Sequence, residues 1–192
     1  MFAFVIGSLG FLCYFLYDIN SIWMRKKILN LLFGTGCLLV IWATVWMLRQ
    51  RWPQRGGSFF LYAFCGTAAV IFFVLLIYTL FFALPFQETY IRENQERLAY
   101  TEGVYALCRH PGVLWFAGLY LGLAGFCGDG GFLLFAAVMT AWNVLYVVFQ
   151  DCWVFPKTFR NYSEYKSQTP FLLPTLGSLK KCLSGRKGEK SL

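Results

Sequence analysis

Charged residues are scarce in this chain of 192 residues, where Asp, Glu, Lys and Arg together make up 14% of the sequence. A soluble domain carries about 25% charged residues, so this composition excludes an ordinary soluble protein. Cysteine pairs of the CxxC type are also missing, and we expect no metal site. Hydrophobic residues make up 58% of the chain and aromatic residues 20%, which indicates an integral membrane protein.

Several apolar runs approach the length of about 20 residues that a hydrocarbon core requires. They are 1–17, 28–48, 58–86 and 132–149. A fifth run, 113–127, is shorter and is typical of the first arm of a tight hairpin, because the glycine-rich residues 128–131 follow it. The sequence therefore predicts an all-α integral membrane protein with about five transmembrane helices, a C-terminal helical hairpin and a cytoplasmic interfacial tail helix.

The first apolar run could also be a cleaved signal peptide. It has no Lys or Arg before its apolar core and no small-x-small cleavage pattern, so a membrane span is the better interpretation. The third run is longer than one span requires, which predicts a tilt or a break near Pro85. We expect no buried charge inside the spans, and this argues against a small transporter, because intramembrane ionisable residues commonly mark a transport pathway.

Basic residues are distributed unevenly between the predicted loops. With five spans, the first loop, the third loop and the tail share one side of the membrane and hold 14 of the 17 basic residues. The positive-inside rule then places the N-terminus outside and the tail in the cytoplasm, and the short loops favour a prokaryotic plasma membrane. The net charge of +8 is therefore a signal of topology, and we expect no nucleic-acid partner.

We expect the chain to be organised in three regions. They are a three-span scaffold over 1–86, a region of loop, hairpin and tail that carries the site over 87–177, and a disordered basic tail over 178–192. Within the second region, residues 87–102 are expected to form a short surface helix or an extended entry to the site. Aromatic residues among charged ones predict a surface helix over 150–166, interrupted near Pro156.

Two polar segments flank the apolar hairpin, one at residues 103–111 and the other at residues 150–174. A hairpin returns the chain to the side from which it came, so both segments can meet at one membrane surface. In the first segment, Pro111 suits the first turn of a helix, whose free amide groups favour anions. The two segments therefore predict a site at the membrane surface.

Three side chains give this site its chemistry. Arg109 offers a bidentate donor for a carboxylate or phosphate. His110 is the only histidine, and its charge depends on its surroundings. On the other arm, Asp151 offers an acceptor for an amine or for hydroxyl groups. A cationic donor facing a carboxylate matches a zwitterionic ligand.

The first segment contains a G-x-Y-x-x-x-R-H-P pattern, formed by Gly103, Tyr105, Arg109, His110 and Pro111. This pattern resembles the signature of the isoprenylcysteine carboxyl methyltransferase and phospholipid methyltransferase superfamily. The second element of that family also has a counterpart, a tyrosine pair followed by Thr-Pro and a final proline. These residues are Tyr162, Tyr165, Thr169-Pro170 and Pro174. Counting back from the tyrosine pair places the family's paired glutamates on Gln150 and Asp151.

The resemblance, which covers residues 103–174, implies an enzyme that uses S-adenosylmethionine to methylate an acceptor from the bilayer. It implies that Arg109 and His110 are the catalytic residues that orient the cofactor or the acceptor. The cofactor-binding residues that it implies are Tyr105, His110, Pro111, Gln150, Asp151, Tyr162 and Tyr165. Acceptors in the family are prenylcysteine carboxylates or phospholipid amines. With no visible acid–base residue beyond His110, a carboxylate or thiolate is favoured, because an ammonium group must first lose a proton.

The chain departs from the family pattern at several positions. Val113 stands where the family commonly has Tyr, Gln150 replaces the first glutamate, and Asp151 shortens the second. Thr158-Phe159 replaces a Phe-Gly pair. These departures are compatible with a different acceptor, with weaker cofactor binding or with a member that has lost activity. The interpretations that stay open are methyl transfer to a prenylcysteine-like carboxylate or similar group, N-methylation of a phospholipid amine, and a non-catalytic membrane protein of the same fold that binds a lipid or a partner.

Overall fold

The computed structural model describes residues 1–52, 58–83 and 97–184, and every regular element within them is helical. The long helices are α1 (Phe2–Ile19), α2 (Leu31–Gln50), α3 (Phe59–Phe81), α6 (Pro111–Cys127) and α7 (Gly130–Phe149). The short ones are α5 (Val104–Leu107), α8 (Phe155–Thr158), α9 (Tyr162–Gln168) and α10 (Leu176–Ser184). Two π-helical turns, η1 (Asn20–Met24) and η3 (Gln150–Val154), extend α1 and α7, and a 3-10 turn, η2 (Lys27–Asn30), leads into α2.

Among the described residues, 4 helical stretches are long and apolar enough to cross a membrane. They are Phe2–Met24, Lys27–Gln50, Phe59–Phe81 and Gly130–Thr158. The prediction of an all-helical protein with apolar helices of membrane-spanning length is therefore confirmed. The α6 helix, with 17 residues, is shorter than these four and forms the first arm of the predicted hairpin. Gly128 closes that hairpin with φ +62°, a conformation that suits glycine.

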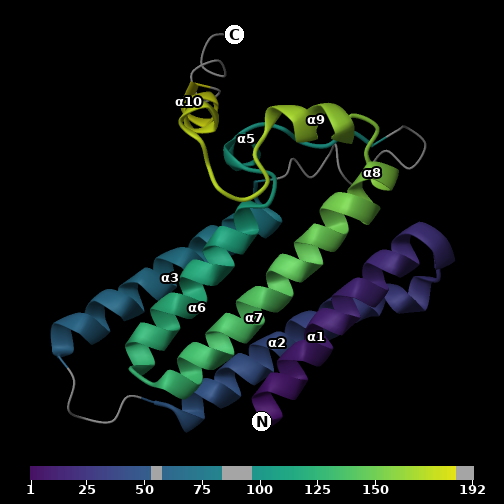
Figure 1. Ribbon diagram of the computed structural model, residues 1–192. Helices are drawn as coiled ribbons and strands as arrows, with labels where there is room; N and C mark the ends of the chain where they lie inside the picture. Colours follow the sequence, from purple (N-terminus) through teal and green to yellow (C-terminus); the bar gives the residue numbers. More distant parts are fainter. Residues whose placement is uncertain (53–57, 84–96, 185–192) are drawn as a thin grey trace.

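The long helices lie side by side in the order α2, α1, α7, α6 and α3 (Figure 1). Their shared core is aromatic: Phe11 of α1, Tyr120 of α6 and Phe132 and Phe135 of α7 are each at most 2% exposed. Many large apolar side chains point outward instead, such as Phe64 of α3, which is 73% exposed. An apolar outer surface is costly in water and suits contact with lipid.

Small residues let neighbouring helices approach closely. On α6, a Cβ atom added to Gly122 would lie 2.9 Å from the backbone nitrogen of Ala69 on α3. On the α1–α2 contact, a Cβ atom added to Gly36 would lie 2.8 Å from the carbonyl oxygen of Gly10. Close packing through glycine is typical of helix pairs in membranes, where the bilayer itself supplies no hydrophobic drive for association.

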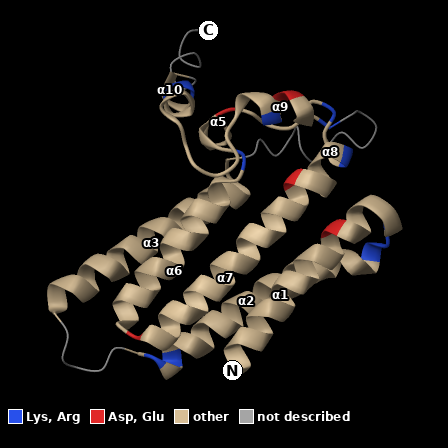
Figure 2. Ribbon diagram, viewed as in Figure 1, with Lys and Arg blue, Asp and Glu red and all other residues tan. Residues whose placement is uncertain are grey.

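Contacts at the two ends of the bundle fix which loops lie together. At one end, the ammonium group of Lys157 lies 4.3 Å from the ring centre of Trp23, so the turn after α1 adjoins the tail. At the other end, Arg51 Nη1 lies 2.9 Å from Asp129 Oδ2, so the segment after α2 adjoins the α6–α7 turn. Figure 2 shows the charged residues gathered at these ends and absent from most of the helical length of the described chain. The N-terminus and α10 lie at opposite ends of the bundle (Figure 1).

The structure differs from the sequence-based expectation in three places. The first helix extends beyond residue 17, through Ile19 and the η1 turn, which brings Asp18 into the span. The surface helix over 150–166 is interrupted between α8 and α9, and Pro156 lies in the first turn of α8, where a proline is tolerated. The expected disorder from residue 178 is wrong for the described part of the tail, because α10 is helical. Pro85 and residues 87–96 of the expected surface helix or extended entry lie outside the described residues, and residues 97–102 are not helical.

Candidate functional site

The 103–111 segment folds as a short helix, a bend and the start of α6. Gly103 precedes α5 with φ +58° and ψ −129°, a backbone conformation that a residue with a Cβ rarely adopts. Cys108 is extended and fully buried. Pro111 then occupies the first turn of α6, as predicted, and its missing amide hydrogen costs nothing there. This path places the side chains of Arg109 and His110 at the end of the bundle that carries the tail.

The second polar segment begins where α7 changes to the η3 turn. A π-helical turn contains one residue more than an α-helical turn and is frequent at functional sites. Here its first two residues point to different partners: Gln150 contacts α1, whereas Asp151 contacts the 103–111 segment. The chain then continues through α8 and α9, which return over the end of α6 (Figure 1).

The side chain of Asp151 is the centre of the site, with an exposed fraction of 5%. Its Oδ1 accepts a hydrogen bond of 2.8 Å from Arg109 Nε and one of 2.6 Å from the hydroxyl of Tyr162, and lies 3.3 Å from His110 Nε2. Its Oδ2 lies 2.9 Å from Lys166 Nζ and 3.3 Å from Arg109 Nη2. One buried carboxylate therefore holds four side chains, and with Arg109 and Lys166 both cationic the cluster carries a net positive charge. We call these five residues the Asp151 cluster.

Arg109 also binds the backbone of the tail. Its Nη1 donates hydrogen bonds of 2.9 Å and 2.8 Å to the carbonyl oxygens of Lys166 and Thr169. The amide nitrogen of Arg109 donates to the carbonyl oxygen of Pro170 at 2.9 Å. The guanidinium group thus joins the two polar segments both through a carboxylate and through main-chain oxygens, a use of its planar donor set that lysine cannot reproduce.

His110 lies in an aromatic and largely buried setting. Its ring stacks on Phe155 at an interplanar angle of 10°, and the ring of Phe171 meets it edge-on. Burial lowers the pKa of His110 to about 4, even though the neighbouring Asp151 carboxylate favours the protonated form. The imidazole is therefore neutral at pH 7. Because an ionised Oδ1 of Asp151 can only accept, the network assigns the proton to Nε2 and leaves a lone pair on Nδ1.

The lowered pKa of His110 predicts a loss of stability on acidification. Because the unfolded chain binds the proton at about pH 6.5 and the folded chain only at about pH 4, the stabilisation is complete above pH 6.5 and is lost as the pH falls towards 4. The shift corresponds to about 3 kcal/mol in all. Thermal unfolding of the wild type in detergent should show the melting temperature falling from pH 7 to pH 5, with a slope due to this protonation. The His110→Gln variant should lack it, and an unchanged slope in that variant would contradict the assignment.

Two further tyrosines of the motif support the backbone. The hydroxyl of Tyr165 donates to the carbonyl oxygen of Tyr105 at 2.7 Å, and the hydroxyl of Tyr105 donates to the carbonyl oxygen of Thr79 on α3 at 3.0 Å. Burial raises the pKa of Tyr105 to about 12 and also raises the pKa of Tyr165, so both hydroxyls stay protonated and can donate. These two residues connect α9 to α5 and α5 to α3.

Gln150 lies apart from the Asp151 cluster. Its Nε2 donates to Asp18 Oδ2 at 2.9 Å and to the hydroxyl of Tyr146 at 2.8 Å. Asp18 is 5% exposed, and none of the ion pairs among the described residues includes it. The first span therefore contains a buried ionisable residue, which the sequence-based expectation did not include. The sequence feature that could have revealed this residue is the position of Asp18 directly after the first apolar run, where we expected a loop.

The contact between Asp18 and Gln150 predicts that their functional groups can be exchanged. Replacing Gln150 with Glu puts two carboxyl groups side by side in a buried place, and we expect the free energy of unfolding to fall by about 1–3 kcal/mol. Adding Asp18→Asn restores one carboxyl and one amide, so the double variant should recover most of this loss. The measurement is thermal unfolding in detergent.

An exposed carboxyl–amide pair provides the control. Gln168 Nε2 donates to Glu164 Oε1 at 3.2 Å on the surface of α9. The Gln168→Glu variant should lose no more than about 0.5 kcal/mol, because water screens the two carboxylates. If the double variant at positions 18 and 150 were no more stable than Gln150→Glu alone, the two residues would not be coupled.

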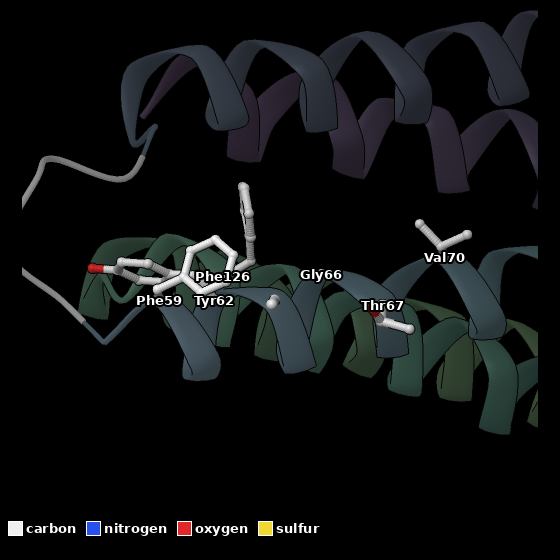
Figure 3. Close-up of a pocket in the computed structure, with 7 residues that line it drawn as sticks. Phe59, Tyr62, Gly66, Thr67, Val70 and Phe126 are labelled. Carbon is white, nitrogen blue, oxygen red and sulfur yellow. The ribbon is translucent and has the colours of Figure 1, made fainter.

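An apolar groove and a polar cavity open on different parts of the described chain. The apolar groove, of about 450 Å³, is lined by residues of α3, among them Tyr62, and by Phe126 of α6, at the end away from the Asp151 cluster (Figure 3). The polar cavity, of about 180 Å³, lies between α5, α9 and α10. Its lining residues are Thr101, Ala106, Asn161, Glu164, Tyr165, Gln168, Thr169 and Lys181. Of the predicted site residues only Tyr165 lines it.

The structure thus brings together four of the predicted site residues in one hydrogen-bonded cluster, namely Arg109, His110, Asp151 and Tyr162. Lys166 joins them and was missed, because a lone lysine on a charged surface helix carries no distinctive sequence signal. In the described residues no group of three or more His, Cys, Asp or Glu side chains could hold a metal ion. Comparison of the chain with protein-family models, curated proteins and solved structures finds no match, so the case for a function rests on the motif residues and their geometry.

Proposed function

We propose that this protein transfers a methyl group from S-adenosylmethionine to a lipid-like acceptor in the membrane, such as a prenylcysteine-like carboxylate. The observation that supports the proposal is the contact between the two motif elements. Arg109 of the first element and Asp151 of the second are 42 positions apart in the sequence and are joined by a hydrogen bond. Both elements lie at one end of the apolar bundle, where a site can meet a polar cofactor and a membrane-borne acceptor together.

The polar cavity is suited to bind the polar end of the cofactor. Its carboxylate from Glu164 and its ammonium group from Lys181 match the amine and carboxylate of an amino-acid group. A cavity of about 180 Å³ lies below the range of about 300–1,000 Å³ of whole-ligand sites, so it fits this end of the cofactor and not the entire molecule. S-adenosylmethionine supplies, when bound, an electrophilic methyl group on a sulfonium. The protein's part is to hold and orient the reactants, which can contribute much of the rate.

The state of His110 favours a carboxylate acceptor. An ammonium acceptor needs a general base with a pKa near the working pH, and the pKa of His110 is lowered to about 4. A carboxylate acceptor needs no deprotonation, since it enters the reaction as an anion. The positive charge of the Asp151 cluster, with Lys166 about half exposed, attracts such an anion. N-methylation of a phospholipid amine is therefore the less favoured chemistry.

The topology that we infer has five crossings, with α6 as the fifth. The α6 helix packs along α3 from Trp115, which donates to Thr79 near one end, to Phe126, whose ring contacts Tyr62 near the other. A helix that accompanies a spanning helix over this distance crosses the same layer. The positive-inside rule then favours the tail and the Asp151 cluster on the cytoplasmic side and the N-terminus outside. The short loops favour a prokaryotic plasma membrane as the host.

The proposal is tested by calorimetric titration of the detergent-purified protein with S-adenosylhomocysteine. Wild-type protein should bind in the micromolar range, and Lys181→Gln should weaken binding by about tenfold, the effect of one charge-assisted hydrogen bond. Lys180→Gln is the matched control, because its neighbour Lys181 lines the cavity and Lys180 does not. Equal affinities in the two variants would contradict the placement of the cofactor.

One observation favours a second candidate, a non-catalytic membrane protein that binds a lipid or a partner. Both oxygens of Asp151 are engaged by side chains of the protein itself, and neither the apolar groove nor the polar cavity described above is lined by Arg109 or His110. A cluster of this kind can also have a purely structural role, namely to hold the tail against the hairpin. Absence of S-adenosylhomocysteine binding to folded wild-type protein would favour this candidate over the methyltransferase.

A further inference from the structure

The α10 helix is amphipathic, but its apolar side faces away from the protein. Leu176, Leu179 and Leu183 are 82%, 44% and 60% exposed, and their spacing of three and four positions places them along one face. On the opposite face Ser178 is 4% exposed and Lys181 lines the polar cavity. A helix on a soluble surface has the reverse arrangement, with its apolar stripe towards the core.

Another exposed leucine precedes the helix. Leu173, just before α10, is 77% exposed and adds a fourth leucine to the same stretch of chain. We call Leu173, Leu176, Leu179 and Leu183 the leucine strip. Full burial of a leucine side chain is worth about 1.5–3 kcal/mol, so leaving the strip in water would forgo several kilocalories per mole. An apolar phase is the environment that removes this cost.

The position and charge of α10 indicate which apolar phase this is. The helix lies beside α5, at the end of the bundle where α3 ends and α6 begins (Figure 1). Lys180 flanks the leucine strip, and Arg186, Lys187 and Lys190 follow in the sequence. No acidic residue occurs between Glu164 and Glu189. Basic residues beside an apolar stripe, at the end of membrane-spanning helices, are complementary to the headgroups of anionic lipids.

We propose that α10 lies in the headgroup layer of an anionic bilayer, with its leucine strip towards the acyl chains. In this position the inner face of α10, which includes Lys181, forms the wall of the polar cavity, so the bilayer holds that wall in place. The inference concerns a lipid-binding surface and does not depend on methyl transfer. A second copy of the chain is a poorer occupant, because two such strips would bring their flanking lysines together.

Fluorescence quenching in nanodiscs tests this placement. The full chain, with Cys152 and Cys182 replaced by serine, carries an environment-sensitive dye on a new cysteine at Leu179 or, as the matched control on the inner face, at Lys181. The double-serine variant without a new cysteine measures the signal of dye attached to the remaining cysteines, and this signal is subtracted. Discs contain one chain each, phosphatidylcholine with or without about a third of phosphatidylglycerol, and spin-labelled lipid as the quencher.

We expect spin-labelled lipid to quench the dye at position 179 at least about threefold more strongly than at position 181, and more strongly when phosphatidylglycerol is present. Quenching at position 179 by aqueous iodide instead of by lipid would overturn the proposal. Shielding of position 179 from both quenchers would also overturn it, since the strip would then be covered by protein. Equal lipid quenching in discs with and without phosphatidylglycerol would refute the anionic preference.

Discussion

Replacing Arg109 with alanine is expected to lower the free energy of unfolding by about 3–5 kcal/mol, because it removes the buried one of the two cations that compensate the Asp151 carboxylate. The cation that remains, Lys166, is about half exposed. The side chains of Arg109 and Asp151 are only 8% and 5% exposed, so little water replaces the lost partner. The same substitution removes both hydrogen bonds to the carbonyl oxygens of Lys166 and Thr169. Thermal unfolding in detergent measures the loss.

A second arginine–aspartate pair in the same chain provides a matched control. Arg51 and Asp129 lie 2.9 Å apart, much like the buried pair, but their side chains are 46% and 30% exposed. Arg51→Ala should therefore cost no more than about 1 kcal/mol. Arg109→Lys should fall between the two, because lysine retains the charge but cannot make the bidentate and carbonyl contacts together. Equal losses in Arg109→Ala and Arg51→Ala would contradict the role of burial.

The expected loss of stability affects the interpretation of an activity assay of Arg109→Ala. If the proposed methyl transfer were lost in Arg109→Ala, that loss alone would not identify Arg109 as a catalytic residue, since the variant also loses the contacts between the hairpin and the tail. Variants on the wall of the polar cavity separate the two effects. They change groups that are accessible to a ligand and leave the Asp151 cluster intact.

Replacing Gly122 with leucine is the second change with a large expected effect. The new Cβ atom would lie 2.9 Å from the backbone nitrogen and 3.0 Å from the Cα of Ala69, and backbone atoms cannot move aside as the end of a flexible side chain can. We expect α3 and α6 to be pushed apart, at a cost of about 3 kcal/mol, the upper part of the range for overpacked cores. The displaced helices would also strain the hydrogen bonds of Tyr105 and Trp115 to Thr79.

Gly34 supplies the control for this substitution. It lies on α2, and no atom outside its own stretch of helix comes within 4 Å of an added Cβ atom. Gly34→Leu should therefore leave the melting temperature unchanged or raise it, because leucine favours a helix more than glycine does. If Gly122→Leu were as stable as Gly34→Leu, the close approach of α3 and α6 would not be needed for the fold.

The sequence by itself determined the helical class, the location of the apolar helices and the place of Pro111 in the first turn of α6. These features depend on local properties, namely runs of apolar residues, glycine-rich turns and the geometry of proline, which act over a few neighbouring positions. The motif residues also predicted which two segments carry the polar site. The number of membrane crossings and the reaction remain proposals.

The tertiary structure decided which polar groups meet. Gln150 and Asp151 are neighbours in sequence, yet the η3 turn directs one to Asp18 on α1 and the other to Arg109. A local sequence pattern does not predict the directions of these two side chains, because they depend on how α7 packs between α1 and α6. The outward leucine strip of α10 has the same origin: periodicity defines an apolar face, but only packing and the surrounding phase decide which way that face points.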